Sequence, residues 1–202
     1  GVRPLAHLNV PYFGFIDEPE QSAGRVARAG DAWIAVCAKG DSSAFVAHVR
    51  WATTGGRSVR NTHPFGMKGR VMAHNGGFGS LARLEAELGP YADLVLGDTD
   101  SERYFALITK ETDAHGGDVG AGIAAAASWI AAHLPVSSLN AIVAAPGELW
   151  ALRYPDQHAL HILGRPEGGE LHVRSATSSV HVPDLADAAS VVIASEKLDG
   201  EN

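Results

Sequence analysis

Helix-forming and strand-forming patterns occupy separate blocks of this chain. Between about residues 81 and 133 apolar side chains recur at helical spacing, whereas the segments on either side alternate short apolar runs with turn residues. Strands followed by helices and then by strands again are typical of an α+β protein with antiparallel sheets, and not of a βαβ alternation. This order of blocks constrains the fold more than any other feature of the sequence.

Three helices are expected in the central block. Leu81, Leu84 and Leu88 fall on one face of a first helix that ends at Gly89-Pro90. A second helix begins at Thr99, because Thr99 and Glu102 have the spacing of a capping box. The third covers residues 119–133, and its Ala-rich middle permits close approach to a sheet.

Short strands are expected on both sides of the helices. Residues 8–16 resemble an edge strand broken by Pro11, and residues 25–29 a second strand. Residues 32–39 fit either a short helix or a buried strand, and residues 45–50 and 69–74 resemble the two arms of a wide hairpin. After the helices, strands are expected at residues 140–144, 149–153, 160–163, 171–174 and 190–194.

Composition excludes several classes of partner. With 16 Lys and Arg against 23 Asp and Glu, the formal net charge is −7, so we expect neither nucleic acid nor an anionic membrane to bind. The single cysteine, Cys37, lies in an apolar stretch and is expected to be inert. The sequence has no long apolar run or leader, so we expect one cytoplasmic domain spanning residues 1–202.

Polar clusters at the ends of apolar runs are the candidates for chemistry. Arg50 ends a strand, and a guanidinium there could grip a carboxylate with two parallel hydrogen bonds. The alternative is an ion pair, or a stem packed over Trp51. Asn75-Gly76 offers a side-chain amide and an unobstructed backbone N–H, the two donors of an oxyanion hole. The alternative is a type I′ hairpin turn, which favours Asn-Gly without any chemistry.

Acidic and imidazole side chains form the remaining candidates. Asp100, just before or within the second helix, could receive the ammonium of an amino acid, although helix capping also explains its place. His63 could act as a base or order a loop. A metal site from His63, His74, Asp98 and Asp100 lacks the close ligand spacing of zinc motifs, so neither a metal nor another cofactor is expected.

In this order the clusters resemble one family. The chain is similar to the class II glutamine amidotransferases, the N-terminal-nucleophile glutaminase domains of glucosamine-6-phosphate synthase, amidophosphoribosyltransferase and asparagine synthetase. The matching motifs are Arg50-Trp51-Ala52-Thr53-Thr54-Gly55, Asn61-Thr62-His63-Pro64, His74-Asn75-Gly76, Asp98-Thr99-Asp100-Ser101-Glu102 and Ala194-Ser195-Glu196. Thr54 stands where the family usually has His.

The resemblance implies a fold and a set of roles. The fold is a four-layer αββα sandwich with two antiparallel sheets between helices. Arg50 would hold the α-carboxylate of glutamine and Asp100 its α-ammonium, while Asn75 and the N–H of Gly76 would be the oxyanion donors. The remaining substrate-binding positions implied by the resemblance are Trp51, Thr53 and His63.

The nucleophile of this family is a cysteine at the mature N terminus, whose own α-amine is the base. The given chain begins with Gly1, so we expect that a segment bearing the cysteine strand is absent from it. The expected activity is hydrolysis of the side-chain amide of glutamine or a γ-glutamyl compound, with a separate synthetase subunit as a candidate partner. The alternatives are a γ-glutamyl amidase of ergothioneine-type synthesis and a catalytically dead amino-acid-binding pseudoenzyme.

Overall fold

The computed structural model describes residues 26–29, 32–35, 46, 48–50, 58–168, 171–174, 179–182, 189–197 and 199–200. For the strands before residue 58 and for those at 171–174, 179–182 and 199–200 it describes the backbone. The expected strand at residues 8–16 and the cysteine at position 37 lie outside the described residues.

Two compact units make up the chain, one ending at Leu152 and the other starting at Arg153. The strands of the first unit are β1 (Val26–Ala29), β2 (Ala32–Ala35), β3 (Val49–Arg50), β4 (Phe65–Met67), β5 (Arg70–Phe78), β6 (Val136–Ala145) and β7 (Glu148–Leu152). Its helices are η1 (Val59–Asn61), α1 (Leu81–Leu88), η2 (Gly89–Leu94), α2 (Asp100–Ala114) and α3 (Val119–His133). The second unit contains β8 (His161–Arg165), β9 (Leu171–Arg174), β10 (Ser179–Val182), β11 (Ser190–Ala194) and β12 (Asp199–Gly200).

The described strands pair antiparallel throughout, and β4, β5, β6 and β7 form a four-stranded sheet in that order. Together with the helices, this confirms the α+β class, while the four-layer stacking stays a prediction. The ambiguous segment after residue 31 is resolved as a strand, β2, which pairs with β1 and β3.

The prediction that residues 45–50 and 69–74 form a wide hairpin is wrong. The strand β3 pairs with β2, whereas β5 pairs with β4 and β6. The reason is a tight turn that sequence reading overlooked: Lys68 and Gly69 both have positive φ, at 45° and 75°. Two such residues are typical of a two-residue hairpin, so the short strand β4 takes the edge of β5 that a more distant strand was expected to occupy.

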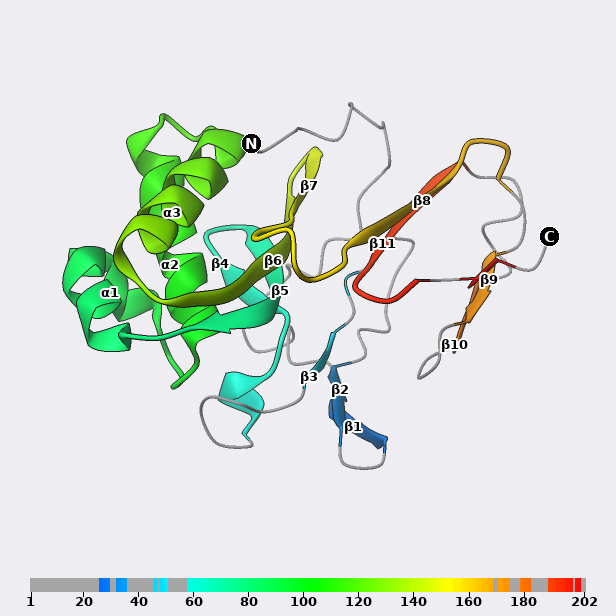
Figure 1. The fold of residues 1–202 in the computed structure, drawn as a ribbon, viewed down its shortest axis with the longest axis horizontal. Coiled ribbons are helices and arrows are strands. Elements are labelled where there is room, and N and C mark those ends of the chain that lie inside the picture. Colours follow the sequence, from blue (N-terminus) through cyan, green and yellow to red (C-terminus); the bar gives the residue numbers. More distant parts are fainter. Residues whose placement is uncertain are drawn as a thin grey trace. The chain divides into compact units, whose positions relative to one another are not determined.

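All three predicted helices are confirmed. The helices α1 and α3 match the predicted residues, and α2 begins after Thr99, whose side chain accepts a hydrogen bond from the backbone N–H of Glu102 at 3.2 Å. Figure 1 shows α2 and α3 beside β5 and β6, against which they pack. No helix in the described part of the chain has the length and apolar character needed to cross a bilayer.

The hydrophobic core of the first unit lies between these helices and the sheet. Tyr104, Phe105 and Leu107 of α2 are fully buried, as are Met72 on β5 and Leu139 on β6. Four consecutive residues of β6, from 138 to 141, are buried, so both faces of the sheet are covered at this point. The backbone of this sheet is therefore held by packing on both sides, beneath the residues at its surface.

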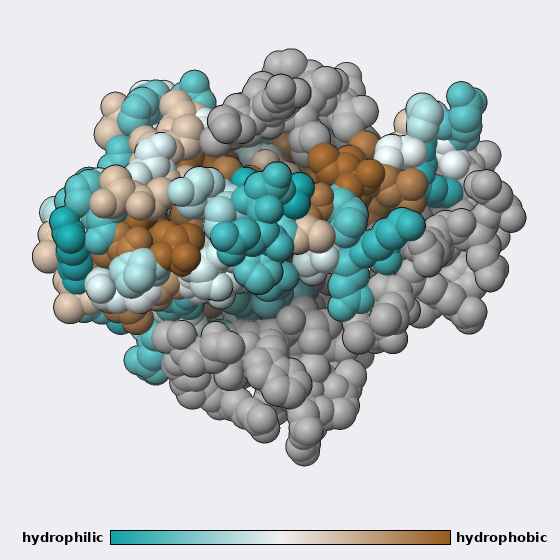
Figure 2. All heavy atoms as spheres, viewed as in Figure 1, coloured by the Kyte–Doolittle hydropathy of each residue, from teal (hydrophilic) through white to brown (hydrophobic). Residues whose placement is uncertain are grey.

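In the second unit, β8 pairs with β11, and β9 lies between β10 and β12. Apolar side chains gather at the surface over β8 and β11 (Figure 2). Among them Ile162 is 53% exposed. An open hollow on this pair of strands is lined by His161, Ile162, Leu163, Val192, Ala194 and Lys197, and contains none of the predicted site residues.

Candidate functional site

The predicted oxyanion donors lie where a buried strand reaches the surface. From Arg70 to His74 every residue of β5 is buried, Asn75 and Gly76 are exposed, and Phe78 is buried again. We call Asn75 and Gly76 the β5 window. Both residues are paired with β6, opposite Asn140 and Leu139, so they do not form the type I′ turn that was the alternative explanation of this dipeptide. A strand ladder fixes their backbone more firmly than a hairpin turn would.

Close packing explains why position 76 is glycine. A Cβ atom there would lie 2.1 Å from the carbonyl oxygen of Ser138 and 2.9 Å from Nε2 of His74. Both distances are far below ordinary contact, and the first involves backbone that cannot rotate away. The glycine is therefore required by the approach of β6 to β5, in addition to any role of its N–H.

The carboxylate of Asp100 lies next to this strand. Asp100 is the first residue of α2, is 5% exposed, and accepts a hydrogen bond through Oδ1 from the backbone N–H of Ser101 at 2.9 Å. Its other oxygen, Oδ2, lies 3.5 Å from the position that a Cβ on Gly77 would take. A negative charge is favourable at a helix N terminus. The structure thus brings the Asp100 carboxylate beside Gly77, the residue that follows the β5 window along the strand.

His74, the residue of β5 just before the β5 window, is buried and connects β5 with α2 and β6. It is 2% exposed, and its Nδ1 lies 2.9 Å from Oγ of Ser101 while Nε2 lies 3.1 Å from the carbonyl oxygen of Ser138. A carbonyl only accepts hydrogen bonds, so Nε2 carries the proton and Nδ1 accepts from the Ser101 hydroxyl. Burial lowers the pKa of His74, and the nearby charge of Asp100 opposes this effect. The imidazole is therefore a neutral link between β5, β6 and α2.

The other predicted substrate-binding residues are less fully described. Arg50 is the last residue of β3, opposite Trp33, and the description of it covers the backbone. Trp51 and Thr53 lie outside the described residues. The ring of His63 is 3% exposed and lies 4.2 Å from the ring of His48 and 4.6 Å from that of Phe65.

Two residues near Asp100 were not recognised as site residues from the sequence. Asn61 and Glu102 are 1% and 4% exposed, and both accept hydrogen bonds from the segment that leads into α2. The capping-box spacing identified Glu102 as a helix residue but not this use of its side chain. Asn61 belongs to the same Asn-x-His-Pro motif as His63, and this was the signal available for it.

Within the described part of the chain, no group of three or more His, Cys, Asp or Glu side chains could hold a metal ion. Both nitrogens of His74 are engaged by protein partners, as shown above.

Comparison with known proteins identifies the family of the chain. The family model described as "Glutamine amidotransferases class-II" matches residues 28–202, which include every motif discussed above. No curated protein matches the chain. Because the family model covers most of the sequence, the chain belongs to the class II glutamine amidotransferases.

Proposed function

We propose that the protein hydrolyses the side-chain amide of L-glutamine or of a γ-glutamyl compound, releasing ammonia or an amine. The observation that carries this proposal is the position of the buried Asp100 carboxylate beside Gly77, next along β5 to the exposed β5 window. A site that holds an amino acid by its charged end and presents amide donors to the far carbonyl needs these two features side by side.

In the proposed complex, Asp100 accepts hydrogen bonds from the α-ammonium of the substrate and Arg50 pairs with its α-carboxylate. Trp51, Thr53 and His63 complete the walls of the pocket. The γ-carbonyl then lies against the side-chain amide of Asn75 and the backbone N–H of Gly76. These donors stabilise the negative charge that develops on the carbonyl oxygen.

The proposed nucleophile is a cysteine at the N terminus of the mature natural protein, with its α-amine as the base. Its sulfur attacks the γ-carbonyl carbon, and the nitrogen of the amide leaves as ammonia after taking up a proton. Water then attacks the thioester, which gives glutamate and restores the thiol. The β5 window supports this chemistry through its backbone, because pairing with β6 holds the peptide units of Asn75 and Gly76 in place.

Two destinations for the products are compatible with this site. The protein could pass ammonia to a separate synthetase subunit, or it could act as a γ-glutamyl amidase for which hydrolysis is the purpose. We place either activity in the cytoplasm, where a nucleophilic cysteine stays reduced.

The test is ammonia release by the full-length natural protein from L-glutamine and from a panel of γ-glutamyl amides. Asn75→Ala should lower kcat by about 10²- to 10³-fold, the effect of removing one oxyanion donor. Asp100→Asn should raise the KM for L-glutamine, because the α-ammonium loses its charged partner. The matched control is Asp98→Asn, since Asp98 is an exposed carboxylate two residues away and should leave both parameters unchanged.

The outcomes separate the alternatives. Turnover of L-glutamine excludes a dedicated γ-glutamyl amidase, and turnover of γ-glutamyl compounds alone identifies one. Binding of L-glutamine with no turnover of any compound in the panel identifies a pseudoenzyme. Absence of both binding and turnover contradicts the proposal.

A further inference from the structure

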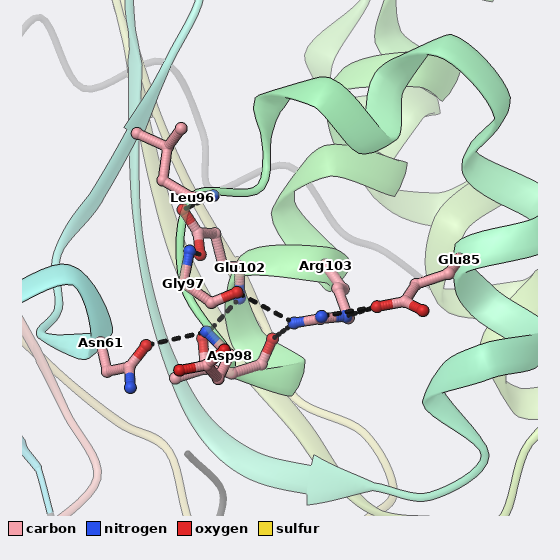
Figure 3. Close-up of polar contacts among 8 residues, drawn as sticks. Asn61, Glu85, Leu96, Gly97, Asp98, Glu102 and Arg103 are labelled. Carbon is pink, nitrogen blue, oxygen red and sulfur yellow. Dashed lines mark hydrogen bonds and ion pairs between the residues drawn. The ribbon is translucent and has the colours of Figure 1, made fainter. Parts of the chain in front are cut away.

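The segment that leads into α2 is held by side-chain acceptors from two directions. The carboxylate of Glu102 accepts from the backbone N–H of Leu96 at 2.9 Å through Oε1 and from that of Gly97 at 2.7 Å through Oε2. From the other side, Oδ1 of Asn61 accepts from the N–H of Asp98 at 2.9 Å. Figure 3 shows the three contacts converging on consecutive peptide units.

A third side chain holds the carbonyls of the same segment. Nη1 of Arg103 donates to the carbonyl oxygen of Thr99 at 2.9 Å and lies 3.4 Å from that of Gly97. On its outer side, Nε of Arg103 donates to Glu85 at 2.6 Å (Figure 3). Side chains thus engage the N–H groups of residues 96–98 and the carbonyls of residues 97 and 99, which restrains the segment.

Position 97 must be glycine for the two acceptors to come this close. A Cβ atom on Gly97 would lie 2.4 Å from Oδ1 of Asn61 and 3.0 Å from Oε2 of Glu102. Any side chain at this position would push both acceptors away from the backbone that they hold. The glycine, the amide and the carboxylate therefore form one unit.

Helix capping alone does not account for Glu102. In a capping box its carboxylate would return to the N–H of the N-cap residue, Thr99. Here the carboxylate reaches residues 96 and 97, beyond the cap, while Thr99 accepts from the N–H of Glu102. The contacts of Glu102 thus determine the path by which the chain enters α2. Because Asp100 directly follows the cap residue Thr99, this path also determines where Asp100 lies.

We propose that Glu102 and Asn61 are positioning residues that set where the carboxylate of Asp100 lies beside β5, without touching the substrate themselves. This inference rests on the proposed function, in which Asp100 binds the α-ammonium. It also gives a physical reason for the Asn-x-His-Pro motif, because Asn61 joins that motif to the acidic one. A shift of the segment carries Asp100 away from the ligand and weakens recognition of the ammonium group in particular.

The experiment compares two non-hydrolysable ligands, L-glutamate and glutarate, which is L-glutamate without its α-ammonium. Their dissociation constants are measured by titration calorimetry on the full-length natural protein and on Glu102→Gln. The amide of Gln can accept at one end only and presents a donor to the second N–H, so the segment loses a contact. We expect the preference for L-glutamate over glutarate to fall by about tenfold, the effect of one weakened charge-assisted hydrogen bond.

A general loss of stability would weaken the binding of both ligands alike and leave the ratio of their dissociation constants unchanged. The matched control is Glu85→Gln, which removes the negative charge of the outer partner of Arg103 but none of the contacts to residues 96–98, and should keep the wild-type ratio. Asp100→Asn should abolish the preference, and combining it with Glu102→Gln should cause no further loss of preference, because both changes act on the same ion pair.

Outcomes distinguish the inference from the proposed function. A wild-type protein with no preference for L-glutamate contradicts the proposed function, and the positioning role falls with it. A wild-type preference that Asp100→Asn removes and Glu102→Gln retains overturns the positioning role alone. If circular dichroism shows that Glu102→Gln does not fold, Asn61→Ala decides, since it removes one contact from outside the helix and is expected to lower the same ratio.

Discussion

At the residue scale, the site depends on glycines, whose missing Cβ atoms leave space for neighbouring polar groups. Gly76 and Gly97 each leave room for a neighbouring polar atom, the Ser138 carbonyl oxygen and the Asn61 amide oxygen respectively. Neither of these two glycines has a positive φ. Their common property is therefore the missing Cβ, which lets strands and acceptors approach closely, and not unusual backbone geometry.

Gly76→Ala is expected to lower the free energy of unfolding by about 1–3 kcal/mol or more, the cost of overpacking against backbone. The new methyl group would lie 2.1 Å from the Ser138 carbonyl oxygen, so β5 and β6 must separate. Chemical denaturation measures the change. The control is Gly66→Ala on the neighbouring strand β4, where the nearest atom is 4.0 Å away and the change should stay within about 0.5 kcal/mol. Equal effects of the two substitutions would contradict the close approach.

The sequence identified some of these residues and missed others for a physical reason. Asn75 stood out as a polar residue that directly follows an apolar run, and Asp100 as a carboxylate at the start of a capped helix. The use of Glu102 was hidden, because a carboxylate at capping-box spacing predicts a local contact and the backbone it holds lies five and six residues upstream. The bond between His74 and Ser138 spans 64 residues, so no local pattern could predict it.

At the element scale, the helices were predictable because their signals are local. Caps, apolar spacing and breakers lie within each helix or beside it, and α1, α2 and α3 follow them. Strand pairing depends on residues far apart, and the prediction failed where a tight turn at Lys68 and Gly69 gave β5 a different neighbour. The strands β4, β10 and β12 were missed as well, being three, four and two residues long.

The packing of α2 on α3 can be tested by whether a glycine-to-alanine substitution raises or lowers stability. Replacing glycine by alanine inside a helix normally stabilises it by about 0.5–1 kcal/mol. Gly122→Ala in α3 should instead destabilise the protein by about 1–3 kcal/mol, because the added methyl group would lie 2.7 Å from the backbone N and Cα of Thr112 in α2. Thermal unfolding followed by circular dichroism gives the change.

The control is a pair of variants, Ser128→Ala and Ser128→Gly, at an exposed position of the same helix. The alanine variant should be the more stable of the two by about 0.5–1 kcal/mol, which is the ordinary propensity effect where no neighbour is approached. If Gly122→Ala raised the melting temperature, propensity would outweigh the contact and the close packing of α2 and α3 would be refuted.

At the scale of the whole molecule, two groups in the described part of the chain, one buried and one bridging, make stability depend on pH. His74 lies in the core with a lowered pKa caused by burial. Asp113 accepts hydrogen bonds from Lys68 at 2.5 Å and from Tyr91 at 2.7 Å, so it joins α2 to the β4–β5 turn and to η2. The hydrogen bond from Lys68, followed by that from Tyr91, lowers the pKa of Asp113.

The signs of the two effects follow from linkage. When the folded pKa lies below the unfolded one, the unfolded chain binds the proton first as the pH falls, and stability decreases. For His74 this loss begins near the unfolded value of 6.5 and continues down to its folded pKa. For Asp113 the stabilisation is fully present above 3.8 and is lost as the pH falls through its folded pKa. The two windows are therefore separate.

We expect the free energy of unfolding, measured by denaturant titration from pH 8 to pH 3, to fall in two stages. As the pH falls below about 6.5, the single proton that His74 takes up when the chain unfolds contributes a slope approaching about 1 kcal/mol per pH unit. His74→Gln should flatten this stage, since its amide can still donate to the Ser138 carbonyl without titrating. Asp113→Asn should leave it intact and flatten the acid stage below pH 4. An unchanged slope near pH 6 in the His74 variant would show that the buried imidazole is not the group responsible, and titration of His74 in NMR spectra at or above pH 6.5 would contradict its lowered pKa directly.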